Sequence, residues 1–351
     1  MVTGLRVLLV VSFALVPVGC EPDFGDRPSN VNALRVLAVQ SQPAEATPGA
    51  AVTYSALVVD PTGTLDDESV DWAYCTEPKP IAEPNDVTLV CFNQTADWIV
   101  ELGVGAGASG KVPNDACRQF GSDVPEGKPG DPPGRPADPD PTGGYYQPVR
   151  LIVPLAGAAV PYLALGQTRI ECPLAGAAPE VSAQMTLHYR ANENPELSDV
   201  VALIDGEPGP TLGPGVAIPA GATVAFRASW PACPEPAACG DDICSAGEDA
   251  TTCAQDCGPG AHGCGGSEQY GYFDTTTGSI IDRHEAMRVS WFSPSGSFRD
   301  DSTGRTADDW VESSTDAYWT APSTTGVVPI WVVIRDDRGG VTWRSVTVTV
   351  Q

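Results

Sequence analysis

The stretch Gly326–Val350, GVVPIWVVIRDDRGGVTWRSVTVTV, decides the fold. Two runs rich in β-branched residues flank the turn sequence Asp-Asp-Arg-Gly-Gly, in which Gly339 and Gly340 permit positive φ angles. Alternate apolar residues of the two runs fall on one face of each run: Val328, Ile330, Val332, Ile334, Val346, Val348 and Val350. This period of two predicts an antiparallel hairpin that turns one face toward a core.

The same order of elements occurs twice in the chain: a strand, a Pro/Gly turn, an alternating strand, and a strand with a central tryptophan. The segments are Asn32–Val39, Pro48–Val58 and Ser69–Tyr74, then Leu197–Ile204, Pro219–Trp230 and Met287–Phe292. Trp72 and Trp291 hold equivalent positions and are expected in the cores. We also expect Met185–Tyr189, with His188, to be strand. The sequence predicts an all-β protein of two antiparallel sandwiches.

This pattern resembles the tandem immunoglobulin-like and PKD-like domains of bacterial surface proteins, including lipoproteins of deltaproteobacterial type. The C-terminal stretch carries the clearest match, from Trp319-Thr-Ala-Pro322 through the final hairpin. The resemblance implies immunoglobulin-like sandwiches and no particular activity. The expected division is a signal peptide (1–19), a lipid-anchored tether (20–30), a first domain (31–194) with a disordered Pro-rich excursion (122–144), and a second domain (195–351) with a cysteine-rich insertion (233–264).

The N-terminus predicts export. Arg6 precedes a mostly apolar segment, Val7–Val16, which is too short for a spanning helix and is typical of a signal peptide. Val18-Gly19-Cys20 resembles a bacterial lipoprotein signal, in which the cysteine is acylated, with a palmitate chain for example. Pro17 departs from that pattern, and the alternative is an ordinary signal peptide with Cys20 in a disulfide. The resemblance implies a membrane-anchored protein of the outer membrane or cell surface.

The cysteine count agrees with export. Without Cys20, ten of the eleven cysteines remain, and an exported chain uses them as disulfides. They form two even sets, and the pairing within each set stays open. The first set is Cys75, Cys91, Cys117 and Cys172; the second is Cys233, Cys239, Cys244, Cys253, Cys257 and Cys264.

The second cysteine set resembles a short repeat, C-G-D/N-G-x-C-x-x-G-E-x-x-x-x-C-x-x-D-C, found in surface proteins of similar bacteria. Asp242 stands where that repeat has Gly. Such a small module depends on covalent links because it buries little apolar surface. Its acidic residues offer hard oxygen ligands, so calcium is a candidate cofactor beside a plain acidic surface. The candidate ligands are Asp241, Asp242, Glu248, Asp249 and Asp256. A second acidic set lies in loops of the last domain: Asp300, Asp301, Asp308, Asp309, Asp336 and Asp337.

Composition limits the function. The formal charge of −26 argues against a nucleic-acid partner, which needs clustered Lys and Arg. The three histidines, His188, His262 and His284, form no metal-binding or catalytic motif, and no nucleophile elbow or phosphate loop is present. We therefore expect no catalysis and no required cofactor. The expected role is structural, adhesive or partner-binding, with the membrane and an unidentified envelope protein or glycan as partners. The alternative is a glycan-binding or hydrolase-accessory surface protein.

Overall fold

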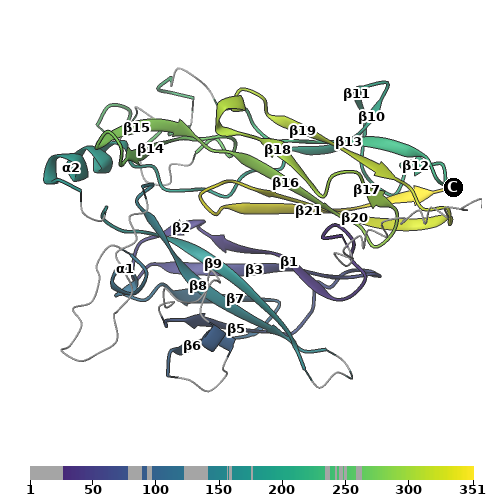
Figure 1. The fold of residues 1–351 in the computed structure, drawn as a ribbon, viewed down its shortest axis with the longest axis horizontal. Coiled ribbons are helices and arrows are strands. Elements are labelled where there is room, and N and C mark those ends of the chain that lie inside the picture. Colours follow the sequence, from purple (N-terminus) through teal and green to yellow (C-terminus); the bar gives the residue numbers. More distant parts are fainter. Residues whose placement is uncertain are drawn as a thin grey trace, which may run out of the picture.

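The computed structural model describes residues 27–351 except 78–88, 93–96, 122–140, 156, 158–159, 175–176, 234–237, 242, 245–247, 249–250 and 258–262, and the side chains of residues 187 and 188. The predicted signal peptide, Cys20 and most of the Pro-rich excursion lie outside the described residues. Two β-sandwiches lie side by side, so the predicted all-β fold is confirmed (Figure 1).

The first sandwich has two sheets. One contains β1 (Arg35–Gln42), β3 (Ala51–Asp60), β4 (Gly63–Thr64) and β7 (Gly107–Lys111). The other has the order β2 (Glu45–Ala46), β9 (Tyr162–Glu171), β8 (Gly144–Val153), β5 (Val70–Cys75) and β6 (Ile99–Gly105). Two helical turns lie in its connections, η1 (Leu89–Phe92) and α1 (Ala116–Gln119).

The second sandwich repeats this plan. One sheet has the order β11 (Glu207–Thr211), β10 (Asp199–Ile204), β13 (Thr223–Ser229), β19 (Ser314–Thr320) and β17 (Ser297–Phe298). The other has the order β12 (Ala217–Ile218), β21 (Val341–Val350), β20 (Gly326–Arg335), β16 (Met287–Phe292) and β18 (Ser302–Arg305). In both sandwiches a two-residue strand pairs in parallel with the last strand, β2 with β9 and β12 with β21. This shared parallel pair supports a repeated immunoglobulin-like topology.

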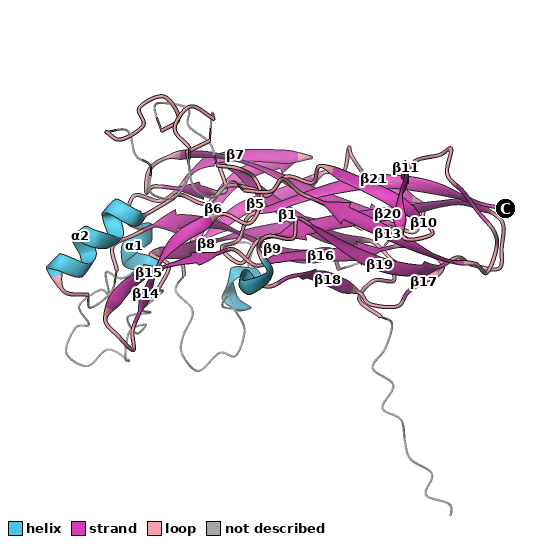
Figure 2. Ribbon diagram, turned by 90° about the horizontal axis from the view of Figure 1, so that it is seen from above, coloured by secondary structure: helices cyan, strands magenta, loops and turns pink. Residues whose placement is uncertain are grey.

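Three elements stand outside the two sandwiches. The helix α2 (Pro179–His188) packs against a separate hairpin of β14 (Gln269–Asp274) and β15 (Ser279–His284), and η2 (Ala307–Asp309) lies beside β15 (Figure 2). The expected strand at Met185–Tyr189 is therefore wrong. Pro179 in the first helical turn and the good helix formers that follow it favour a helix, and Met185 is buried in that helix.

The core of the second sandwich matches the predicted face of the final hairpin. Val328, Ile330, Val332 and Ile334 pack in one cluster with Val348 and Val350, and Val346 lies partly buried against it. Trp72 and Trp291 are fully buried in the middle of β5 and β16. Gly339 has the expected positive φ of 106°. Gly340 does not, and it is required for space: a Cβ there would lie 2.1 Å from Asp336 Oδ2.

The opposite face of the same hairpin joins the two sandwiches. Trp331 and Val333 of β20 and Val341 of β21 form a third buried cluster with Leu37 and Leu57 of the first sandwich. Trp331 Nε1 also donates to Thr64 Oγ1 at 2.9 Å. The continuous apolar run of β20 is thus explained by burial on both faces.

Two expected boundaries differ in the structure. Pro141 at the end of the Pro-rich excursion accepts a hydrogen bond from Phe273 N at 2.7 Å, and Gly144 already belongs to β8. Arg27–Asn30, expected as part of a polar tether, contact the second sandwich. Both segments are ordered by partners that are distant in sequence.

The ten cysteines that follow Cys20 form five disulfides, each within its predicted set. The pairs are Cys75–Cys91, Cys117–Cys172, Cys233–Cys264, Cys239–Cys253 and Cys244–Cys257. Disulfides at this density mark an exported, extracytoplasmic protein. Within the described residues, none of the helices has the length and apolar character needed to cross a membrane.

Candidate functional site

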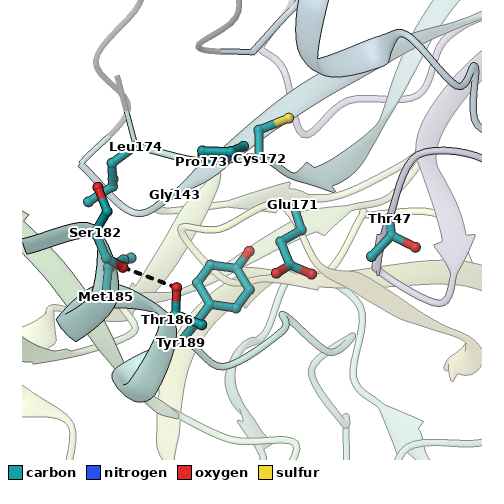
Figure 3. Close-up of a pocket in the computed structure, with 10 residues that line it drawn as sticks. All are labelled: Thr47, Gly143, Glu171, Cys172, Pro173, Leu174, Ser182, Met185, Thr186 and Tyr189. Atoms are coloured by element: carbon teal, nitrogen blue, oxygen red, sulfur yellow. Dashed lines mark hydrogen bonds between the residues drawn. The ribbon is translucent and has the colours of Figure 1, made fainter. Parts of the chain in front are cut away.

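A cavity of about 300 Å³ opens where α2 meets the end of β9 (Figure 3). Glu171 is its one carboxylate, and Thr47, Ser182 and Thr186 add hydroxyl groups. The remaining lining is apolar or aromatic: Gly143, Cys172, Pro173, Leu174, Met185 and Tyr189. The residues labelled in Figure 3 come from α2 and the residue after it, from the end of β9 and the segment that follows it, from Gly143 before β8, and from Thr47 after β2.

Local packing keeps this cavity open. Thr186 Oγ1 donates to the Ser182 carbonyl at 3.0 Å, which turns its hydroxyl back onto the helix. A Cβ on Gly143, whose φ is +76°, would lie 3.1 Å from Met185 Cε and from the Tyr189 ring. The Cys117–Cys172 disulfide secures the chain directly after β9.

Glu171 is the charged group of the cavity. Partial burial raises its pKa, and the neighbouring carboxylate Glu45 raises it further. Glu45 lies deeper and accepts a short hydrogen bond from the Tyr189 hydroxyl. The cavity therefore offers acceptors and a carboxylate to a ligand with donor groups. Among the described residues that line it, none is a histidine or lysine that could act as a base toward a nucleophile.

Behind the cavity a buried ionic network crosses between the two sandwiches. Arg169 of β9 pairs with Glu45 of β2 at 3.1 Å, and both side chains are 1% exposed. Glu45 Oε2 also accepts the Asn192 backbone N–H at 2.6 Å. Asn192 Nδ2 in turn donates to the Asp336 carboxylate at 3.3 Å, in the turn between β20 and β21. Asn192, in the chain that connects the sandwiches, is thus held by a carboxylate of each sandwich.

Arg338 is the centre of this network. Its Nε donates to Glu285 Oε1 at 2.6 Å and its Nη2 to Glu268 Oε2 at 3.3 Å. Its Nη1 donates to the Arg190 carbonyl at 2.7 Å. Its own carbonyl accepts the Tyr146 hydroxyl of the first sandwich at 3.0 Å. The guanidinium thus reaches three partners, and the backbone carbonyl a fourth, from one tight turn.

Carboxylates outnumber guanidinium groups around Arg338. Burial raises the pKa of Glu268 to about 7 and the pKa of Glu285 well above its ordinary value, while Arg338 lowers both. Burial likewise raises the pKa of Asp336, although two backbone N–H groups and Asn192 donate to it. Perturbed carboxylates of this kind also occur in active sites, but these are enclosed by hydrogen-bond partners at the joint. They act here as structural groups.

The sequence pattern did not single out this network. Of its residues, the sequence pattern indicates only Asp336, as a member of the second acidic set. The second acidic set does not converge. Asp301 pairs with Arg27, Asp300 with Arg299, and Asp309 accepts from Thr306.

The cysteine-rich insertion brings together two of its five predicted ligands. Oxygen atoms of Glu248 and Asp256 lie within 4.8 Å of each other and of the sulfurs of Cys239 and Cys253. Those sulfurs form a disulfide, so they are not thiolate ligands. Asp256 Oδ2 accepts the Gly240 N–H at 2.5 Å, and Asp241 Oδ1 accepts the Ile243 N–H at 3.0 Å. Asp242 and Asp249 lie outside the described residues.

Of the three histidines, the structure describes the side chain of His284. The ring of His284 stacks on Trp310 with centroids 4.1 Å apart, and its Nδ1 lies 3.2 Å from the Ser267 carbonyl. His188 is in α2, where its side chain is not described, and His262 lies outside the described residues. Five of the eight tryptophans are buried, and the other three, Trp98, Trp310 and Trp343, are half-buried.

Comparison with known proteins gives no family. No protein-family profile and no curated protein matches the sequence. A nucleoside hydrolase-related hypothetical protein from Saccharophagus degradans is 14% identical over 44% of this chain and 26% of that one, with a TM-score of 0.20. The Yersinia pseudotuberculosis adhesin InvE is 10% identical over 92% of this chain and 61% of that one, also at 0.20.

A third solved structure is the C-terminal domain of the Streptococcus pyogenes antigen I/II-family protein AspA. It is 8% identical over 91% of this chain and all of that one, with a TM-score of 0.23. The chain thus spans about a quarter and three fifths of the first two proteins named above. TM-scores this low support no statement about function.

Proposed function

We propose that this chain is a non-catalytic, lipid-anchored protein of the cell envelope with a structural, adhesive or partner-binding role. The disulfide pattern is the observation that supports the proposed lipid anchor. The ten cysteines after Cys20 pair among themselves, which leaves Cys20 as the odd one of eleven. This pattern disfavours the alternative that Cys20 is a disulfide partner, and it favours acylation of its sulfur.

The absence of catalysis is proposed from the placement of the acidic groups. Glu268, Glu285 and Asp336 have raised pKa values, and all three are held by Arg338 or Asn192 inside the joint. The cavity under α2 offers one carboxylate, whereas acid–base hydrolysis of a glycoside uses two that face each other. An extracytoplasmic body with a small, mainly apolar cavity beside α2 suits binding.

The test of the anchor is incorporation of labelled palmitate in a bacterial host. We expect label in the wild-type chain and none in Cys20→Ala, with the variant released from the membrane fraction. Label in Cys20→Ala would refute acylation at this residue. Crosslinking in intact envelope, followed by identification of the captured protein, tests the partner-binding role, with Cys20→Ala as the control for membrane placement.

A glycan-binding or accessory role is the second candidate. It requires several aromatic side chains on one exposed face. Trp72, Trp230, Trp291, Trp319 and Trp331 are buried. The three half-buried tryptophans lie on different elements or loops, and Trp310 is already covered by His284. Retention on envelope polysaccharide that is lost in Trp310→Ala would favour this candidate over the first.

A further inference from the structure

The first described residues of the chain do not lie on the sandwich that follows them. Arg27 forms an ion pair with Asp301 of the second sandwich at 2.9 Å, and its guanidinium also donates to the carbonyls of Phe298 and Arg299. Ser29 Oγ donates to Asp301 Oδ1 at 2.6 Å. We call Arg27–Val31 the N-terminal clamp.

Backbone hydrogen bonds complete the clamp. Ser293 N donates to the Ser29 carbonyl at 2.9 Å, and Val31 N donates to the Ser293 carbonyl at 3.1 Å. Val31 is fully buried in the apolar cluster between the sandwiches. The clamp is therefore part of the folded body, and Arg27 is the first residue that the structure describes.

The clamp shortens the reach of the anchor. From Cys20 to Arg27 there are seven residue steps, which span at most about 25 Å when fully extended. Without the clamp the first fixed element would be β1, which begins at Arg35. Fifteen steps would then allow about 50 Å. A lipid on Cys20 thus holds the surface around Arg27 close to the bilayer.

The exit point lies far from the candidate cavity. Arg27 contacts β17 and the loop that follows it, and β17 lies toward one end of the long axis of the molecule, while α2 lies at the other end (Figure 1, Figure 2). The two views agree on this separation. The clamp and the cavity therefore lie toward opposite ends of the molecule.

The surface around the clamp is less acidic than the chain as a whole, which suits it better to lie near a lipid surface. Residues 27–35 and 293–302 carry three arginines and two aspartates, a local charge of 3 − 2 = +1 in a chain of −26. Arg35 belongs to this surface because its Nη1 donates to the carbonyls of Pro28 and Asn30. The tether holds Glu21, Asp23 and Asp26, so the covalent anchor, and not lipid attraction, provides the attachment.

We propose that the N-terminal clamp orients the molecule, so that the β17 edge of the second sandwich faces the bilayer and the cavity under α2 points away from it. This inference rests on the proposed lipid anchor at Cys20. It assigns the clamp as the surface that meets lipid, and it leaves the α2 end available to a partner outside the membrane.

The test attaches the mature chain, Cys20–Gln351, to phosphatidylcholine vesicles through a bond between the Cys20 thiol and a maleimide lipid. This coupling is independent of acylation in the cell. A dye is placed through an azide-bearing residue at Ser297 in β17 or at Gln184 in α2, and a nitroxide on the lipid headgroups quenches it. We expect several-fold stronger quenching at Ser297. Equal quenching, or stronger quenching at Gln184, would overturn the proposal.

Two variants test the cause of the orientation. A Gly/Ser linker of about 12 residues inserted between Asp26 and Arg27 lengthens the tether by roughly 20 Å and should remove the difference between the dyes. Asp301→Ala removes the carboxylate that binds both Arg27 and Ser29. It should reduce the difference in quenching between the two dyes and expose the Val31 amide to hydrogen exchange. Asp300→Ala is the matched control, because Asp300 pairs with Arg299 and should leave both readouts unchanged.

The palmitate experiment separates the two proposals. If palmitate labels Cys20 but the vesicle-bound dyes are quenched equally, the anchor stands and the orientation fails. If palmitate is not incorporated but the coupled chain shows stronger quenching at Ser297, the clamp sets the reach of the tether and the orientation stands. The proposal of a lipid anchor is then refuted. A Val31 amide that exchanges as fast as an unfolded one would overturn the clamp itself.

Discussion

Arg338 Nε lies 2.6 Å from Glu285 Oε1, and the two side chains are only 1% and 2% exposed. A buried ion pair like this one makes little net contribution when compared with well-packed apolar residues, but removal of one partner is costly. The pair lies where the turn between β20 and β21 reaches the loop between β15 and β16. It therefore ties the final hairpin to the loop that follows the β14–β15 hairpin.

Arg338→Met tests this pair. We expect the free energy of unfolding to fall by about 3–5 kcal/mol, since Glu285 and Glu268 lose their buried cation. Denaturant unfolding at pH 8 measures the loss. Arg299→Met is the control, because its ion pair with Asp300 is exposed and should change stability by less than about 0.5 kcal/mol. Equal losses in the two variants would show that the joint does not depend on Arg338.

The buried glutamates predict a pH dependence. The pKa of Glu268 is raised to about 7 in the folded protein, above its ordinary value near 4.5. Between pH 4.5 and about pH 7 the folded state binds more protons at this group than the unfolded state does. The free energy of unfolding therefore falls as the pH rises through this range. We expect a lower Tm at pH 8 than at pH 5.5, with a loss of roughly 1–3 kcal/mol.

Glu268→Gln provides the control for that pH effect. The glutamine keeps an oxygen acceptor for Arg338 but has no proton to lose, so the fall in Tm between pH 5.5 and pH 8 should be smaller than in the wild type. If the variant and the wild type lose the same number of degrees, the pH dependence arises from other carboxylates.

Trp331 tests the apolar joint. Trp331→Ala removes a fully buried side chain from the cluster between the sandwiches, together with its hydrogen bond to Thr64. We expect a loss of about 3–5 kcal/mol in denaturant unfolding. Trp310→Ala, at a half-buried ring that stacks on His284, should cost about 1 kcal/mol. A small loss in Trp331→Ala would mean that the sandwiches are stable without each other.

Calcium is tested by thermal unfolding. Asp256 and Asp241 already accept backbone N–H groups, and Asp256 closes the insertion against Gly240. We expect no change in Tm at millimolar calcium. Asp256→Ala should cost about 1–3 kcal/mol with or without calcium, because a backbone donor loses its acceptor. A rise in Tm with calcium in the wild type, lost in Asp256→Ala, would instead establish a calcium site.

The sequence predicts those features that depend on residues close together in the chain. The period of two in Gly326–Val350 identified the core face from Val328 to Ile334, since side-chain alternation is a property of a strand on its own. The cysteine sets could be divided by position, because each set is even and local. The strand expected at Met185–Tyr189 is wrong because a short run of this kind fits a strand and a helix alike.

The sequence alone determined the strand periodicity, the repeat of the sandwich and the excess of acid, since these depend on residues close together in the chain or on composition. Only the tertiary structure decided which residues meet across fifty or more positions of the chain. Arg338 with Glu268 and Glu285, Glu45 with Asn192, and Arg27 with Asp301 are such contacts. Their energies come from burial, and burial depends on which faces pack together. The candidate cavity, the joint and the clamp are products of that packing.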